Sequence, residues 1–179
     1  GGARMMEAAI SLMQLAKKIA KVGIIAGNCD GFIGNRMFHA YITQAHLLVE
    51  EGATPEQVDI AAESWGWAMG PFAVNDLAGN DVGWRIRKGK GKDYYKGKKY
   101  ASTVADRLCE LGRFGQKVGK GFYTYDPQTR KRQSDPEVTK IINDVRREKG
   151  INPRAIDNDE ILSRLHGALV IEGTRILEE

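Results

Sequence analysis

A run of ten residues, Gly27 to Arg36, contains three glycines and ends in Asn35-Arg36, where a long amphipathic segment begins. The carboxamide of Asn35 can donate a hydrogen bond to an oxygen that carries developing charge, and it does so without titrating. The plainer interpretation is that Asn35 is a helix N-cap, since asparagine is among the best residues for that position. Spacing alone favours the N-cap.

Three histidines, His39, His46 and His166, are further candidates for acid–base or metal chemistry. His39 shares a helix face with Asn35. His46 lies two turns beyond His39, ~10 Å away, so the two histidines are too far apart to bind one metal ion. None of the three has a base and an orienting group in the pattern of a catalytic pair. The sequence therefore predicts no metal site.

The glycine-rich stretch 112–121 invites comparison with a phosphate-binding loop. It does not match, because Gly121 follows Lys120 where serine or threonine is required, and because position 114 is phenylalanine. No G-x-G-x-x-G fingerprint occurs anywhere in the chain. We therefore expect no cofactor-binding residues.

The charge of the chain is concentrated in one segment. The 179 residues carry a net charge of +4, and the run 85–100 holds eight Lys or Arg residues beside one Asp. A solvated, mobile loop is the plainer interpretation, and a site for a polyanion such as a coenzyme phosphate is the alternative. Because the rest of the chain is not basic, we expect no nucleic-acid partner. No apolar run approaches the ~20 residues of a membrane span, so no membrane partner is expected either.

Apolar periodicity predicts a chain made mainly of helices. The expected helices cover residues 3–20, 35–51, 54–65, 71–82, 103–111, 136–149 and 159–179, with one strand over 22–26 and an extended aromatic segment before 126. The expected caps are Thr54, as part of a capping box with Gln57, then Asp135 and Asn158. Three tryptophans are expected to be core residues: Trp65, Trp67 and Trp84.

Residues 35–51 and 163–179 resemble each other when they are aligned without gaps. Both begin with a polar residue and an arginine, Arg36 or Arg164, and both end in Glu-Glu. We therefore expect residues 1–26 to be the end of an α/β unit, 27–126 a first helical repeat, and 127–179 a linker helix and the start of a second repeat.

Several motifs in fixed order make a family resemblance specific. They are Gly27–Arg36, Thr54–Asp59, Met69–Gly83 and Gly112–Tyr123. Together they resemble the C-terminal region of (S)-3-hydroxyacyl-CoA dehydrogenases, above all that of the multifunctional fatty-acid β-oxidation enzymes, in which this region is duplicated. One departure is Ala68, which stands where the family usually has proline.

The resemblance implies a helical C-terminal domain that closes over an acyl-CoA, preceded by the last helix and strand of a truncated Rossmann domain. It implies oxidation of the 3-hydroxyl group with NAD. Asn35 matches the active-site asparagine that hydrogen-bonds the reacting oxygen. The segments that line the cleft correspond to Phe32, Met69, Gly70, Pro71 and Phe72.

The family's catalytic histidine and its orienting glutamate lie upstream of the matched region. We therefore expect the isolated chain to be inactive and to bind no NAD. Its expected partners are the missing N-terminal domain and further copies of the chain itself. The alternative is a free-standing helical interaction module whose basic run 85–100 binds a polyanion. The expected compartment is the bacterial cytoplasm, and the alternative is the peroxisome.

Overall fold

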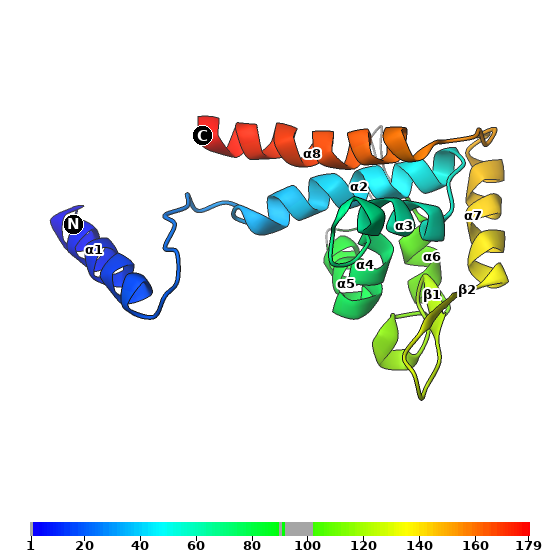
Figure 1. Cartoon of the computed structure of the whole chain (residues 1–179), viewed down its shortest axis with the longest axis horizontal. Coiled ribbons are helices and arrows are strands. Elements are labelled where there is room, and N and C mark those ends of the chain that lie inside the picture. The colour runs from blue at the N-terminus through cyan, green and yellow to red at the C-terminus, as the bar shows by residue number, and fades with distance from the viewer. Residues whose placement is uncertain (1, 90, 92–101) are drawn as a thin grey trace.

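The computed structural model describes residues 2–89, 91 and 102–179, and helices dominate it (Figure 1), which confirms the mainly α prediction. The helices are α1 (Gly2–Lys18), α2 (Gly34–Glu51), α3 (Pro55–Trp65), α4 (Pro71–Ala78), α5 (Asn80–Gly89), α6 (Val104–Glu110), the 3-10 helix η1 (Gln116–Val118), α7 (Pro136–Glu148) and α8 (Asn158–Glu178). The strands are β1 (Tyr123–Tyr125) and β2 (Arg132–Ser134), which pair antiparallel.

The two longest helices, α2 and α8, lie side by side and run in opposite directions (Figure 1). Helices α3, α4 and α7 pack against α2, and α3 also packs against α8. One core fills the space between these elements and includes Leu48, Val58, Phe72, Leu108, Phe122 and Leu165. The buried residues of α2 begin at Tyr41, with Phe38 partly buried against the core, so the first turn of that helix lies outside the core.

The helix starts follow local capping chemistry. Thr54 Oγ1 accepts a hydrogen bond from Gln57 N at 3.1 Å, as predicted for α3. The Gln57 carboxamide does not complete a capping box but donates to the carbonyl of Ile156 at 2.6 Å, which ties α3 to the segment before α8. The predicted Asp135 cap of α7 is confirmed, since its carboxylate accepts from Glu137 N at 2.9 Å.

The predicted cap of α8 is wrong by one residue. Asp157, and not Asn158, is the N-cap, because its carboxylate accepts from Glu160 N at 2.7 Å. Adjacent Asp and Asn residues have almost the same cap preference, so local sequence does not separate them.

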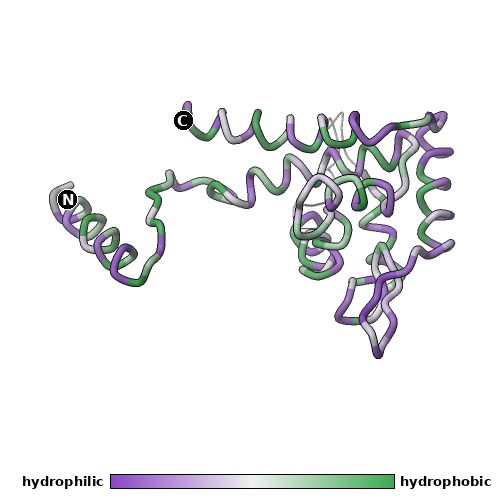
Figure 2. The backbone as a smooth tube through the Cα atoms, viewed as in Figure 1, coloured by the Kyte–Doolittle hydropathy of each residue, from purple (hydrophilic) through white to green (hydrophobic). Residues whose placement is uncertain are grey.

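The strand predicted over residues 22–26 does not form. The segment makes no β pairing with any described residue, and its apolar side chains Val22, Ile24 and Ile25 are exposed. A strand needs a partner for its backbone groups, and the described residues supply none beside it. Helix α1 lies apart from the body, and Figure 2 shows hydrophobic residues along it.

The helix predicted over residues 71–82 is two helices. Asn80 N donates to the carbonyl of Phe114 at 3.1 Å instead of continuing α4, so α5 begins in a new direction. Helix α5 extends to Gly89 and so takes in the start of the basic run, where a loop was the plainer prediction. Most of the run 85–100 lies outside the described residues. Trp65 is 60% exposed, which contradicts its predicted place in the core.

Asp59, with no exposed surface, fixes the start of α4. Its carboxylate accepts hydrogen bonds from Phe72 N and Ala73 N, each at 2.9 Å, and from the Tyr123 hydroxyl at 2.8 Å. Burial raises the pKa of Asp59 to about 6, and these donors act in the opposite direction.

Asp76, equally buried, holds β1 against α4. Its carboxylate accepts from Phe122 N and Tyr123 N at 2.9 and 3.0 Å, and from the Tyr125 hydroxyl at 2.9 Å. A Cβ atom at Gly121 would lie 2.0 Å from Asp76 Oδ1, so only glycine allows this approach. The glycine-rich stretch therefore serves the backbone contact with a carboxylate and not a phosphate.

Replacing Asp76 by alanine removes the acceptor of several buried donors. We expect Asp76→Ala to lower the free energy of unfolding by about 3 kcal/mol or more, because those donors lose their partners without gaining water. Denaturant unfolding of the chain measures the loss. The control is Asp159→Ala in the exposed first turn of α8, which should cost ~1 kcal/mol at most. Equal losses in the two variants would contradict this account.

His46 makes stability depend on pH. It is buried between the rings of Phe72 and Phe122, its Nδ1 has no hydrogen-bond partner among the described residues, and burial lowers its pKa to about 4 from 6.5. Since the unfolded chain binds the proton more tightly, His46 reduces stability as pH falls through 6.5 towards 4.

The variant His46→Leu keeps an apolar side chain of similar size and cannot take up the proton. We expect the stability difference between the variant and the wild type to shift in favour of the variant by ~3 kcal/mol from pH 7 to pH 4. Comparing the two proteins cancels the opposite contribution of Asp59, whose pKa is raised to about 6. A difference that does not change with pH would overturn this prediction.

Candidate functional site

A tight turn leads into α2 and sets the position of its first residues. Phe32 N donates to the carbonyl of Cys29 at 3.2 Å. Gly31 has a φ of 88° and Phe32 a φ of 48°, so two successive residues adopt the left-handed region. That region is costly for phenylalanine, whose side chain is nevertheless 56% exposed. Strain of this kind in an exposed residue is typical of ligand-binding turns.

Asn35 lies inside the first turn of α2 and is not its cap. The helix begins at Gly34, and the N-cap residue is Ile33, which makes no side-chain cap hydrogen bond. Asn35 N donates to the carbonyl of Gly31 at 3.1 Å. The side chain is exposed, and its carboxamide has no hydrogen-bond partner among the residues that the structure describes. The N-cap interpretation is therefore wrong, and the carboxamide is available to a ligand.

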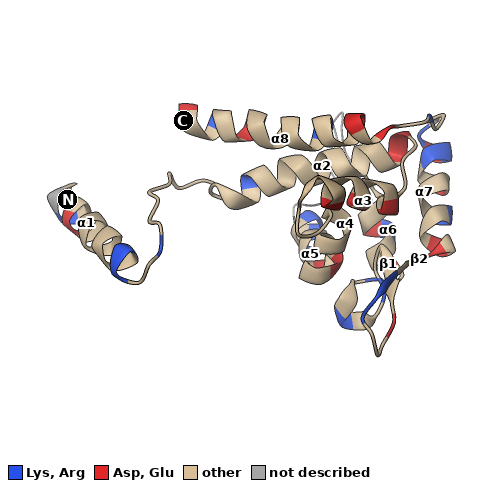
Figure 3. Ribbon diagram, in the orientation of Figure 1, with Lys and Arg blue, Asp and Glu red and all other residues tan. Residues whose placement is uncertain are grey.

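Arg36, the next residue, connects this turn to the far end of α8. Its Nε donates to Glu172 Oε1 at 2.9 Å, and its two terminal nitrogens donate to the carboxylate of Glu179 at 2.5 and 3.1 Å. Nη1 also lies 3.8 Å from Cys29 Sγ, inside the turn. We refer to Arg36, Glu172 and Glu179 as the Arg36 clamp. Figure 3 marks acidic residues along the ribbon near each end of α8.

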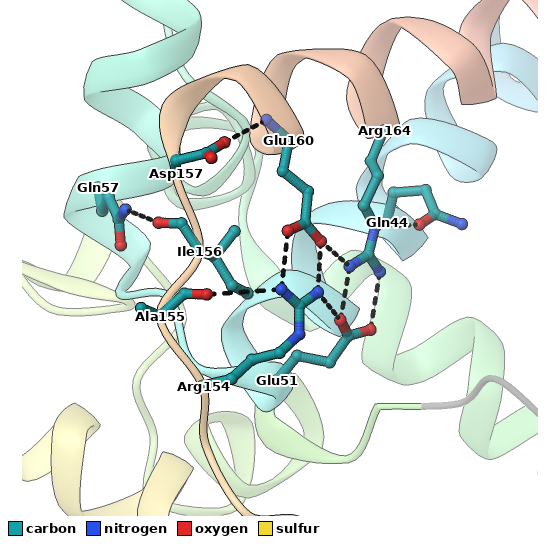
Figure 4. Close-up of polar contacts among 9 residues, drawn as sticks. All are labelled: Gln44, Glu51, Gln57, Arg154, Ala155, Ile156, Asp157, Glu160 and Arg164. Carbon is teal, nitrogen blue, oxygen red and sulfur yellow. Dashed lines mark hydrogen bonds and ion pairs between the residues drawn. The ribbon is translucent and has the colours of Figure 1, made fainter.

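A second clamp joins the same two helices at their other ends. The terminal nitrogens of Arg164 donate to the carboxylate of Glu51 at 2.6 and 2.8 Å, and its Nε donates to Gln44 Oε1 at 3.2 Å (Figure 4). Arg154 joins the network through Glu51 and Glu160.

The two clamps are equivalent: aligning residues 35–51 with 163–179 places the residues of one clamp on those of the other. Arg36 then corresponds to Arg164, and Glu179 corresponds to Glu51, so each arginine binds the glutamate at the end of the other helix. Glu172 corresponds to Gln44 in the same way. The aligned segments thus pack around an approximate two-fold axis. Ser163 takes the place of Asn35 in the second segment, so the available amide belongs to the first one alone.

The turn at residues 69–72 does not meet Asn35. Phe72 is fully buried, with its ring 5.3 Å from that of His46, and α2 rises ~16 Å between Asn35 and His46. Gly70 and Pro71 are buried as well, while Met69 is partly buried against the core. The structure thus places Phe32 and Asn35 at exposed positions beside the start of α2 and places Phe72 in the core.

The histidines do not form a reactive group. His39 is exposed one turn after Asn35, and His166 packs with its ring 4.2 Å from that of Trp65 and 5.5 Å from that of Trp67. Within residues 2–89, 91 and 102–179, no three His, Cys, Asp or Glu side chains gather in a way that could hold a metal ion.

Sequence reasoning missed the Arg36 clamp. A signal was present in the aligned segments, which pair Arg36 with Arg164 and Glu51 with Glu179. Oppositely charged residues at the two ends of equivalent helices indicate an antiparallel pair, but the alignment alone does not say whether the helices touch.

Relatives of the chain agree with the family resemblance. The family model for the 3-hydroxyacyl-CoA dehydrogenase C-terminal domain matches residues 31–125. The peroxisomal bifunctional enzymes of Cavia porcellus and Homo sapiens are 48% and 47% identical to the chain over 180 residues, and each alignment covers 94% of it. The chain spans about a quarter of the length of these curated relatives.

Solved structures show the same fold. The dehydrogenase part of multifunctional enzyme 1 from C. elegans matches with a TM-score of 0.73 and 31% identity, over 96% of this chain and 38% of that one. The (S)-3-hydroxybutyryl-CoA dehydrogenase PaaH1 from Ralstonia eutropha matches with a TM-score of 0.56 and 26% identity, over 65% of this chain and 42% of that one. The family match covers more than half of the chain, which therefore belongs to the 3-hydroxyacyl-CoA dehydrogenase C-terminal domain family.

Proposed function

We propose that the chain is the substrate-binding and interdomain part of a 3-hydroxyacyl-CoA dehydrogenase of fatty-acid β-oxidation. The reaction of the complete enzyme converts 3-hydroxyacyl-CoA and NAD to 3-oxoacyl-CoA and NADH. The observation that carries the proposal is the exposed Asn35 carboxamide, which has no partner in the described part of the chain and follows a strained turn at Gly31 and Phe32. Asn35 lies within the matched family region.

Asn35 would act by holding the 3-oxygen of the substrate. Negative charge develops on that oxygen as its proton leaves, and an amide N–H stabilises the charge without exchanging a proton itself. Fixing the oxygen also fixes the angle at which the neighbouring C–H bond is presented. The exposed ring of Phe32 beside it offers an apolar surface to the acyl chain.

The residues present do not form an NAD site. The chain has no dinucleotide fingerprint, and residues 22–26 build no sheet with the described residues. We assign NAD binding, the catalytic histidine and its glutamate to another part of the complete enzyme. Residues 1–26 would be the end of that NAD-binding domain, 27–126 the first helical repeat, and 127–179 the linker helix and the start of the second.

The names of the relatives favour the peroxisome over the bacterial cytoplasm. The animal relatives are named peroxisomal, and the plant relatives are named peroxisomal or glyoxysomal. Among the described residues, no helix has the length and apolar character needed to cross a bilayer. From the names of these relatives, we propose that the complete protein is a peroxisomal enzyme with an acyl-CoA substrate.

The role of Asn35 is testable in the complete enzyme. We expect Asn35→Ala to lower kcat by ~100-fold or more with a modest rise in KM, because the contact matters most when charge develops on the oxygen. Steady-state kinetics of the dehydrogenase reaction measures both constants. Ser163→Ala, at the equivalent position of α8, is the matched control and should leave kcat unchanged. A wild-type kcat in Asn35→Ala would refute the proposed role.

The 179-residue chain, without the rest of the enzyme, should not catalyse the dehydrogenase reaction. We expect no NADH formation from 3-hydroxyacyl-CoA and NAD, because binding and orientation alone do not supply the proton acceptor that the reaction needs. The assay follows NADH absorbance at high protein concentration, with the complete enzyme as positive control. Turnover by the purified chain that is lost in Asn35→Ala would show that it carries its own base.

A further inference from the structure

The first turn of α2 stands outside the core. The N-cap position provides no side-chain bond, Phe32 and Asn35 are exposed, and the buried residues of the helix begin only at Tyr41. Phe38, one turn further on, is partly buried against the core, whereas the side chains of Arg36 and Met37 make contacts with α8. These contacts are the packing of Met37 near Gly173 and the Arg36 clamp.

The Arg36 clamp is built to fix an orientation. The guanidinium is planar. Its Nε donates to Glu172, its two terminal nitrogens donate to Glu179, and Nη1 also lies near the Cys29 sulfur. Arg36 and Glu172 are only 17% and 16% exposed, so water competes weakly for this ion pair. A bidentate arginine–carboxylate contact defines direction as well as distance.

We propose that Arg36 is a positioning residue, which holds the first turn of α2 against Glu172 and Glu179 so that the Asn35 carboxamide keeps its working orientation. The inference rests on the proposed function of Asn35. Arg36 touches no reacting atom, and it acts through the backbone that it shares with its neighbour. It follows that α8, which begins the second helical segment, contributes to the site without supplying a reacting group.

The second clamp gives an internal control. Arg164 binds Glu51 and Gln44 with nearly the same geometry, between the same two helices, but its neighbour is Ser163 instead of an asparagine. A purely structural role predicts that losing either arginine has the same effect. A positioning role predicts that only Arg36 affects turnover.

The experiment compares Arg36→Met with Arg164→Met in the complete enzyme. We expect similar decreases in Tm for both variants, since each loses one clamp. We expect kcat to fall ~10-fold or more in Arg36→Met, with KM within about two-fold, because a misplaced group loses rate and not ground-state binding. Arg164→Met should keep the wild-type kcat. Arg36→Lys, which keeps the charge but not the planar fork, should recover little of the loss.

A second measurement reports on the turn directly. Hydrogen exchange at the Asn35 and Met37 amides, which donate to Gly31 and Ile33, should be faster in Arg36→Met than in Arg164→Met. If Arg36→Met does not fold, Glu179→Gln replaces it, because Glu179 is 61% exposed and its substitution weakens the same clamp.

The outcomes separate this inference from the proposed function. An unchanged kcat in Arg36→Met, an equal fall in both arginine variants, or an effect on KM alone would overturn the positioning role while Asn35→Ala remains impaired. A wild-type kcat in Asn35→Ala would overturn the proposed function itself. A fall in kcat confined to Arg36→Met and Asn35→Ala supports both.

Discussion

Two carboxylates with no access to water, those of Asp59 and Asp76, hold the helical body in place. Burial raises the pKa of both groups, and the backbone N–H groups and tyrosine hydroxyls that donate to them act in the opposite direction. A charge of this kind is tolerated only where all its donors are present. Asp59 therefore determines where α4 begins, and Asp76 determines where β1 lies against it.

This body supports α2 over only part of its length. The part of α2 that packs on the core contributes to stability, and the exposed start of the helix carries the candidate site. The helix contacts the core from Phe38 and has buried residues from Tyr41, whereas its first turn meets α8 and solvent. A residue that contacts a ligand needs such an exposed place, and it also needs order. The Arg36 clamp supplies order from a neighbouring helix, without burying the amide of Asn35.

Local chemistry explains which elements were predictable. The starts of α3 and α7 follow from Thr54 and Asp135, because a cap acts within three residues of itself. The predicted strand at 22–26 failed because β pairing needs a partner that local sequence does not specify. The break between α4 and α5 lies at Gly79, whose φ is 97°, and Asn80 N then donates to the carbonyl of Phe114, far along the chain; apolar periodicity alone does not reveal this break.

Sequence alone sets the helical pattern, the family motifs and the place of Asn35 at the start of a helix. The packed structure adds that Asn35 is not a cap, that Phe72 belongs to the core, and that Arg36 meets Glu179 across 143 residues. The physical reason is range. Propensity and capping act over one helical turn, while burial and ion pairing between helices depend on how all the helices pack.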